Sequence, residues 1–266
     1  MNSVTLDETI VECKAPSKGK QHYDFIEVGT STWGTLTQYC AGDEWKASGL
    51  GLDMYTRSDD PYYARGLAVE VVRSHLDMLP TLPNVTKICA AMDENSGEDT
   101  LYYVSSENIE RHMGQYHSAL SDDGPFGTEV DVMWYAISLS SIGQPQPELQ
   151  YMLRNVGRPD LLEQQHVSVL SWEDICTQHS VATVDVVQVD CEGKDCAILR
   201  GLLAYCEGEP STFPRIIQFE CNQLTGNDEI EATLNSLMQR GGYELRSRTS
   251  QNIIVERPYR AHDSHQ

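Results

Sequence analysis

Nine short apolar runs, each bounded by turn-forming residues, recur along the 266-residue chain. Segments of helix length separate several of them, and this alternation predicts an α/β fold with a mostly parallel sheet. The runs are YDFIEVG (23–29), GLAVEVV (66–72), VTKICAAM (85–92), TLYYVS (100–105), VSVLS (167–171), VDVVQVDCEG (184–193), RIIQFECN (215–222), YELRSR (243–248) and NIIVER (252–257). The stretches 67–71, 184–190 and 215–220 are almost continuously apolar, so we expect them at the centre of the sheet.

Helical periodicity follows two of these runs. The apolar residues that share one helix face are Val72, Leu76 and Leu79 in 71–82, and Ile230, Leu234, Leu237 and Met238 in 230–243. Gly241 and Gly242 are expected to end the second helix, because glycine commonly occupies that position. The last two runs predict a closing antiparallel hairpin with TSQN (249–252) as its turn.

Two segments, 39–65 and 105–160, do not fit this alternation. Both are rich in glycine, proline, aspartate and aromatic residues. Long segments of this composition are predicted to form loops and lids over one end of the sheet. With no internal repeat and no domain boundary, we predict a single domain over 1–266, with peripheral segments at 1–20 and 258–266.

Charge and composition narrow the classes of partner. The chain has 40 acidic and 19 basic residues and a formal net charge of −21. The negative electrostatic potential of such a chain repels phosphate backbones and anionic lipid surfaces, so neither nucleic acid nor a membrane is an expected partner. No run approaches the roughly 18 apolar residues of a spanning helix, and the first residues lack the apolar core of a signal peptide. A soluble cytoplasmic protein is predicted.

The cysteines predict no disulfide framework and no zinc site. Eight cysteines are present, and five lie in or beside predicted apolar strands and helices. Without a secretory signal, we expect reduced and mostly buried thiols. No paired CxxC or HxxxH occurs, and the four residues between the cysteines of DCEGKDC (190–196) match a metal knuckle poorly.

The most informative block is VATVDVVQVDCEGKDCAILRGL (181–202), in which a predicted strand ends at Asp190 and is followed by Glu192, Gly193 and a predicted helix. This block resembles the iDllKiDvEGaElevLkG signature of the FkbM family of S-adenosylmethionine-dependent methyltransferases. Three other blocks resemble that family in order and spacing: DFIEVGTS (24–31), GLAVEVVRSHLDMLPTLPNVTKICAAM (66–92) and PRIIQFECN (214–222). Together the blocks comprise 66 of the 266 residues and extend from residue 24 to residue 222.

The resemblance implies a Rossmann-like class I methyltransferase fold, in which S-adenosylmethionine lies across the carboxyl ends of the first strands. Gly29 would give the methionine part access to bare backbone, with Thr30 and Ser31 as hydrogen-bond donors. Glu27 would face the amino group of the cofactor, directly or through water. The alternative is that these residues only form a turn.

The second-strand region carries the other cofactor positions that the resemblance implies. Glu70 would accept hydrogen bonds from both ribose hydroxyls, as acids do in dinucleotide sites. Val71, Ala91 and Met92 complete the set, the last two bordering the adenine. The alternative for Glu70 is a solvated strand end.

Asp190 and Glu192 are the candidate catalytic residues. Residues two apart share one face of an extended strand, so their carboxylates would point the same way. Methyl transfer to a hydroxyl requires alignment and removal of a proton, and a carboxylate can serve both needs. Either acid could instead cap the helix that starts near Gly193.

A divalent cation and a histidine base are further options. Glu220 and Asn222 end the next strand and could join Asp190 around magnesium or calcium, which prefer oxygen ligands. The resemblance does not require a metal. Among the histidines that could act as base, those in the second lid are best placed: His112 and His117, ahead of His75, His166 and His179.

The chain departs from the family pattern at Gln188, where the signature has lysine, at Val71, where proline is common, and at Glu27, where aspartate is commoner. The predicted function is S-adenosylmethionine-dependent methylation of a small-molecule acceptor, most readily at oxygen. The alternative is a catalytically silent module that keeps the fold for binding. A nicotinamide dehydrogenase is disfavoured because GxGxxG is missing after the first strand.

Overall fold

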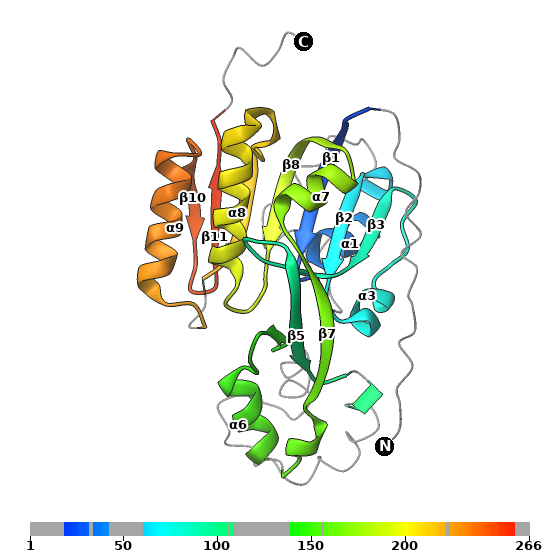
Figure 1. Ribbon diagram of the computed structural model, residues 1–266. Coiled ribbons are helices and arrows are strands. Elements are labelled where there is room, and N and C mark those ends of the chain that lie inside the picture. Colours follow the sequence, from blue (N-terminus) through cyan, green and yellow to red (C-terminus); the bar gives the residue numbers. More distant parts are fainter. Residues whose placement is uncertain are drawn as a thin grey trace.

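The central sheet has seven strands in the order β10–β11–β9–β8–β1–β2–β3 (Figure 1). The computed structural model describes residues 19–31, 34–42, 61–105, 107–108, 139–155, 157–221 and 224–258. The strands of this sheet are β1 (Gln21–Val28), β2 (Gly66–Glu70), β3 (Val85–Cys89), β8 (Val181–Val189), β9 (Ile216–Glu220), β10 (Glu244–Arg248) and β11 (Asn252–Glu256). Strands β3, β2, β1, β8 and β9 are parallel, whereas β11 is antiparallel to both β9 and β10. The predicted mostly parallel sheet with a closing hairpin is confirmed.

Helices cover both faces of this sheet. The helices on one face are α7 (Trp172–Gln178), α8 (Asp195–Gly208) and α9 (Asn227–Gln239), and those on the other are α1 (Thr35–Cys40) and α3 (Arg73–Met78). Trp172 illustrates the packing: it is buried, and its indole Nε1 donates a hydrogen bond of 2.8 Å to the carbonyl of Ile198 in α8. Burying a large apolar side chain contributes about 1.5–3 kcal/mol, so this face anchors the fold.

The two predicted amphipathic helices are confirmed, with shorter bounds. Helix α3 begins after Val72 and ends before Leu79, and both of these residues are buried. Helix α9 ends at Gln239, shortly before Gly242, whose φ of 70° lies in the left-handed region that favours glycine. One assignment is wrong, because Met238 is 41% exposed and does not pack on the core.

A second, smaller sheet has the order β4–β7–β5–β6, with β4 at Ala91–Met92, β5 at Gly97–Tyr103, β6 at Ser141–Ile142 and β7 at Glu163–Leu170. Figure 1 shows β5 and β7 extending away from the central sheet. The predicted strands at 100–105 and 167–171 therefore exist, but they do not belong to the parallel sheet. The run 85–92 also divides, because Ala90 separates β3 in the central sheet from β4 in the smaller one.

The prediction that 105–160 consists of loops is wrong in part. The segment contains β6, helix α6 (Pro147–Asn155) and the start of the 3-10 helix Pro159–Leu161. Helix α6 forms because Leu149, Met152 and Leu153 recur at helical spacing and are buried. Similarly, the predicted loop 39–65 overlaps the end of α1 and the 3-10 helix Pro61–Tyr63. Residues 43–60, 109–138, 1–18 and 259–266 lie outside the described residues.

Two further expectations concern the whole chain. Within the described ranges, no helix is long and apolar enough to cross a membrane. Cysteines 40, 89, 176, 191, 196, 206 and 221 are free thiols, and four of them are buried, as expected; Cys13 is outside the described residues.

Candidate functional site

A cavity of about 270 Å³ opens at the carboxyl ends of β1, β2 and β8. The chain passes from β1 to β2 on one side and enters β8 on the other, so the strand order reverses at this point. Open parallel sheets bind ligands at such reversals. All ten residues that the sequence predicts as site residues line this cavity: Glu27, Gly29, Thr30, Ser31, Glu70, Val71, Ala91, Met92, Asp190 and Glu192.

Gly29 is required by the close approach of two strand ends. Its φ is 77°, and a Cβ at this position would lie 1.9 Å from the carbonyl oxygen of Asp190 and 2.8 Å from Cys191 Sγ. The contact is held because the Asp190 N–H donates to the carbonyl of Val28 at 2.9 Å. The glycine is thus explained by packing of β1 against β8, whether or not a ligand also approaches its backbone.

Glu27 holds the first turn of α1. Its Oε1 accepts a hydrogen bond from Leu36 N at 2.9 Å, and its Oε2 accepts from Thr37 N at 3.1 Å and Thr37 Oγ1 at 2.8 Å. Burial raises the pKa of Glu27 to about 7, although these hydrogen bonds lower it. The carboxylate expected to face an amino group therefore lines the cavity but is already bound to α1.

Glu70 ties the turn after β1 to the end of β2. Its Oε2 accepts from Ser31 N at 2.7 Å, and its Oε1 accepts from Val72 N at 2.8 Å. The alternative of a solvated strand end is wrong, because Glu70 is only 4% exposed. Burial raises its pKa to about 7.

These raised pKa values predict that stability falls as pH rises. Glu27 and Glu70 have a pKa of about 7 in the folded protein and an ordinary value of 4.5, so the folded chain binds extra protons between these values. Their stabilising contribution is complete below the lower value and is lost as pH rises through the higher one. Between about pH 6 and pH 8, the free energy of unfolding should fall by about 1 kcal/mol for each group.

Urea unfolding at several pH values checks this expectation. The substitution Glu27→Gln should remove the share of the pH dependence that belongs to Glu27, whatever its effect on absolute stability. The matched control is Glu173→Gln, because Glu173 is exposed on α7 and should leave the dependence unchanged. A Glu27→Gln protein with the wild-type pH dependence would contradict the expectation.

Three carboxyl groups gather beside the end of β8. Oxygens of Asp190, Glu192 and Glu220 lie within 4.8 Å of one another. Burial raises the pKa of Asp190 to about 6, although a side-chain hydrogen bond with Glu220 lowers it. The premise of an extended strand is wrong: β8 ends at Val189 and Glu192 has a φ of 46°, so a turn brings its carboxylate close. Asn222 is outside the described residues, and a cation here stays a prediction.

Asp195 was missed by the sequence reasoning. It is fully buried and accepts hydrogen bonds of 3.3 Å from the N–H groups of Cys191, Gly193 and Glu220, which fixes the loop after β8 to the end of β9. Burial raises its pKa to about 7. Helix α8 begins at Asp195 without a side-chain cap, so neither Asp190 nor Glu192 caps it, and Asp195 is the acid in its first turn. An acid just after a glycine turn was the available signal.

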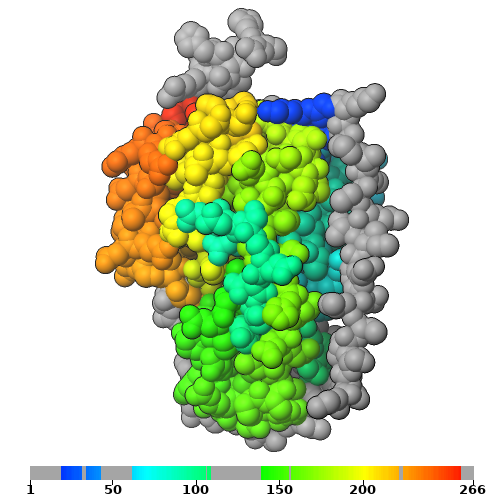
Figure 2. Space-filling view, viewed as in Figure 1, coloured from blue at the N-terminus to red at the C-terminus, as the bar shows by residue number. Residues whose placement is uncertain are grey.

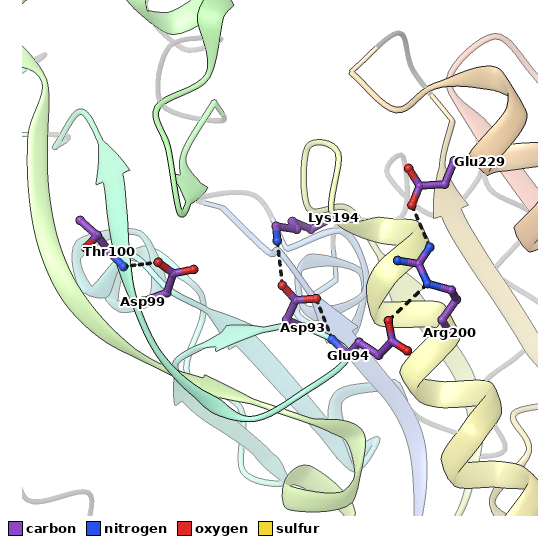
Figure 3. Close-up of polar contacts among 7 residues, drawn as sticks. All are labelled: Asp93, Glu94, Asp99, Thr100, Lys194, Arg200 and Glu229. Carbon is purple, nitrogen blue, oxygen red and sulfur yellow. Dashed lines mark hydrogen bonds and ion pairs between the residues drawn. The ribbon is translucent and has the colours of Figure 1, made fainter.

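The connection between β4 and β5 is fastened to α8. Lys194 Nζ contacts Asp93 Oδ2 at 2.7 Å, and Arg200 bridges Glu94 at 3.3 Å and Glu229 at 2.8 Å (Figure 3). Figure 2 shows this turquoise segment lying against the yellow surface of α8. Since Lys194 also lines the cavity, these ion pairs fix the smaller sheet beside the site.

The smaller sheet forms one wall of the site. Residues 140–142 line the cavity, and Gln146 Nε2 donates a hydrogen bond of 2.7 Å to the carbonyl of Glu192. For these residues the predicted cover over one end of the sheet is present. Of the histidines considered as a base, His75, His166 and His179 do not line the cavity. His112 and His117 are outside the described residues.

Two polar side-chain atoms of residues that line the cavity have unused hydrogen-bonding capacity. Gln188 Oε1 and Ser31 Oγ are buried, and neither has a hydrogen-bond partner in the part of the chain that the structure describes. An unsatisfied buried polar group costs about 1–3 kcal/mol, so such atoms are expected to meet a ligand or water. Gln188 is the position at which the chain departs from the lysine of the family signature.

Comparison of the chain with protein-family models, with curated proteins and with solved structures found no match. The resemblance of its sequence blocks to the FkbM family therefore stays a prediction. The geometry and chemistry of the cavity are the basis for assigning a function.

Proposed function

We propose that the chain is a class I methyltransferase that transfers a methyl group from S-adenosylmethionine to an oxygen of a small molecule. The observation that carries this proposal is the gathering of all ten predicted site residues around one cavity. The sheet adds support: its five parallel strands follow the third–second–first–fourth–fifth order of dinucleotide-binding folds. The hairpin β10–β11 is the closing antiparallel pair that the last two apolar runs predict.

The residues present fit this cofactor. The carboxylate of Glu70 has about four acceptor positions. Backbone N–H groups of Ser31, Val71 and Val72 use three of them, which leaves one for a ribose hydroxyl. Ala91 and Met92 provide an apolar border for an adenine ring. The unused atoms of Gln188 and Ser31 provide an acceptor and a hydroxyl for the remaining polar groups.

The charge of the cavity suits a ligand that carries positive charge. Four acidic residues line it: Glu27, Glu70, Asp190 and Glu192. Among the described lining residues Lys194 is the one lysine or arginine, and it is paired with Asp93. A sulfonium with an ammonium group would be attracted to such a wall, whereas a ligand with several phosphates would be repelled.

In this proposal the chain positions the reactants and removes one proton. S-adenosylmethionine, when bound, supplies an electrophilic methyl group. Asp190 accepts the proton that the acceptor hydroxyl loses, and its pKa of about 6 is near the pH at which a general base works well. Glu220 positions Asp190 through their hydrogen bond, while residues 140–142 shape the space for the acceptor.

The second candidate is a binding module without catalysis. The observation that favours it is the hydrogen bond between Asp190 and Glu220, because it occupies an acceptor position of the carboxylate that is proposed as the base. Calorimetry with S-adenosylmethionine and S-adenosylhomocysteine comes first, and failure of both to bind would overturn the proposal. Binding without methyl transfer to any of a broad panel of hydroxylated acceptors would favour the module.

Glu70→Gln is expected to weaken S-adenosylmethionine binding by about 1–3 kcal/mol, because the amide offers fewer acceptor sites and no charge to the ribose hydroxyls. Calorimetry and the melting temperature are measured on the same protein. Glu98→Gln is the control, since Glu98 is exposed on β5. A folded Glu70→Gln protein with wild-type affinity would remove Glu70 from the ribose site.

A further inference from the structure

A second group of metal-ligating side chains lies at the opposite end of the central sheet from the cavity. His22 and Asp24 are near the start of β1, and Asp185 is on the neighbouring strand β8. One ligand atom from each lies within 4.8 Å of the other two. The strand from His22 to Gly29 spans roughly 20 Å, so this group is separate from the candidate methyltransferase site.

The distances in this group are too long for hydrogen bonds. His22 Nε2 lies 3.6 Å from Asp185 Oδ2 and 3.9 Å from Asp24 Oδ1. Nε2 is a buried atom with no hydrogen-bond partner among the described residues. Ligands bound to one tetrahedral zinc ion at about 2.1 Å are separated by roughly 3.4 Å, so a small contraction would place all three atoms on one ion.

The other ring nitrogen of His22 has a partner that can accept its proton in the metal-binding tautomer. His22 Nδ1 lies 2.7 Å from Thr183 Oγ1, and a proton on Nδ1 that is donated to this hydroxyl leaves the lone pair on Nε2. Metal-bound histidines usually donate their second N–H in this way.

The imidazole is the most exposed member of the group. The side chains of Asp185 and Asp24 are 4% and 12% exposed, whereas that of His22 is 35% exposed and leaves a path from solvent. Asp24 is oriented by Arg65, whose backbone N–H donates to its Oδ2 at 2.8 Å. The guanidinium of Arg65 donates to Gln21 at 2.6 Å.

We propose that His22, Asp24 and Asp185 bind one zinc ion that joins β1 to β8. One imidazole and two carboxylates are ligands that zinc accepts. A water molecule on the exposed side of His22 completes four-coordination. The site is structural and independent of the proposed methyl transfer.

The test uses the full chain after treatment with a chelator. Zinc chloride is added in a calorimeter, bound metal is counted, and the melting temperature is measured with and without zinc. We expect one strongly bound zinc per chain and a higher melting temperature. His22→Ala should abolish both effects, whereas His166→Ala, which alters an exposed histidine on β7, should keep them.

Thr183→Val adds a variant in which all three ligands are retained. Loss of the hydrogen bond to Nδ1 should weaken zinc binding roughly 10- to 100-fold. This variant, together with Asp24→Asn, decides the matter if His22→Ala does not fold. Absence of zinc binding to the wild-type chain would overturn the proposal. Wild-type affinity for zinc in any folded variant of His22, Asp24 or Thr183 would overturn it as well.

Discussion

Asp190→Asn is expected to lower the rate of the proposed methyl transfer by roughly 10²- to 10⁴-fold, the usual contribution of a general base, while the fold and the affinity for S-adenosylmethionine should be kept. The amide has nearly the volume of the carboxyl and can still form a hydrogen bond with Glu220, but it cannot take up a proton. Single-turnover transfer, cofactor affinity and melting temperature are measured on one preparation. The wild-type rate should decrease below about pH 6, because burial raises the pKa of Asp190 to about 6, and the variant should lack this dependence.

Three outcomes of that experiment are distinguishable. Loss of affinity with little change in the rate at saturation would make Asp190 an anchor for the cofactor rather than a base. Wild-type rate and affinity would remove it from the active site. The control is Asp77→Asn, which makes the same chemical change at an exposed position of α3 and should affect neither quantity.

Gly29→Ala should destabilise the protein by about 3 kcal/mol or more, or prevent folding, because small-to-large changes at a close backbone contact cannot be relieved by a rotamer. The added Cβ would lie 1.9 Å from the carbonyl oxygen of Asp190, at a φ of 77° that L-residues rarely adopt. The free energy of unfolding in urea is the measurement.

Gly208→Ala is the matched control, since a Cβ at this last residue of α8 meets nothing within 4 Å. Alanine is favoured over glycine in helices by up to about 1 kcal/mol, so this variant should be unchanged or more stable. Equal stability of Gly29→Ala and the wild type would show that the turn after β1 can move away from β8.

The central sheet could be predicted because each of its strands is marked locally. The stretches 67–71 and 184–190 are buried on both faces and are therefore apolar almost throughout, which is visible without knowing their neighbours. The site residues were assigned through the resemblance to the FkbM family, together with the rule that the carboxyl ends of parallel strands lie at one edge of a sheet. This is why Glu70 and Asp190, 120 positions apart in the chain, could both be assigned to one cavity.

The smaller sheet could not be predicted in the same way. Strand β7 begins with EQQH, whose side chains are mostly exposed, so its first half carries no hydrophobic signal. Its pairing with β5 determines that it is a strand. The roles of Glu27 and Asp195 were hidden for a related reason: each depends on backbone N–H groups that only the folded chain brings to the carboxylate.

The pairing of β1 with β8 has a consequence for how the protein folds. His22 and Thr183 are neighbours across these strands although 161 positions separate them in the chain. Closing so long a loop costs conformational entropy before the stabilising contacts between the two strands can form. Topologies with many such distant contacts therefore fold slowly. During synthesis, a ribosome-bound chain can pair β1 with β2 early, yet both the cavity and the His22 group remain incomplete until β8 has emerged.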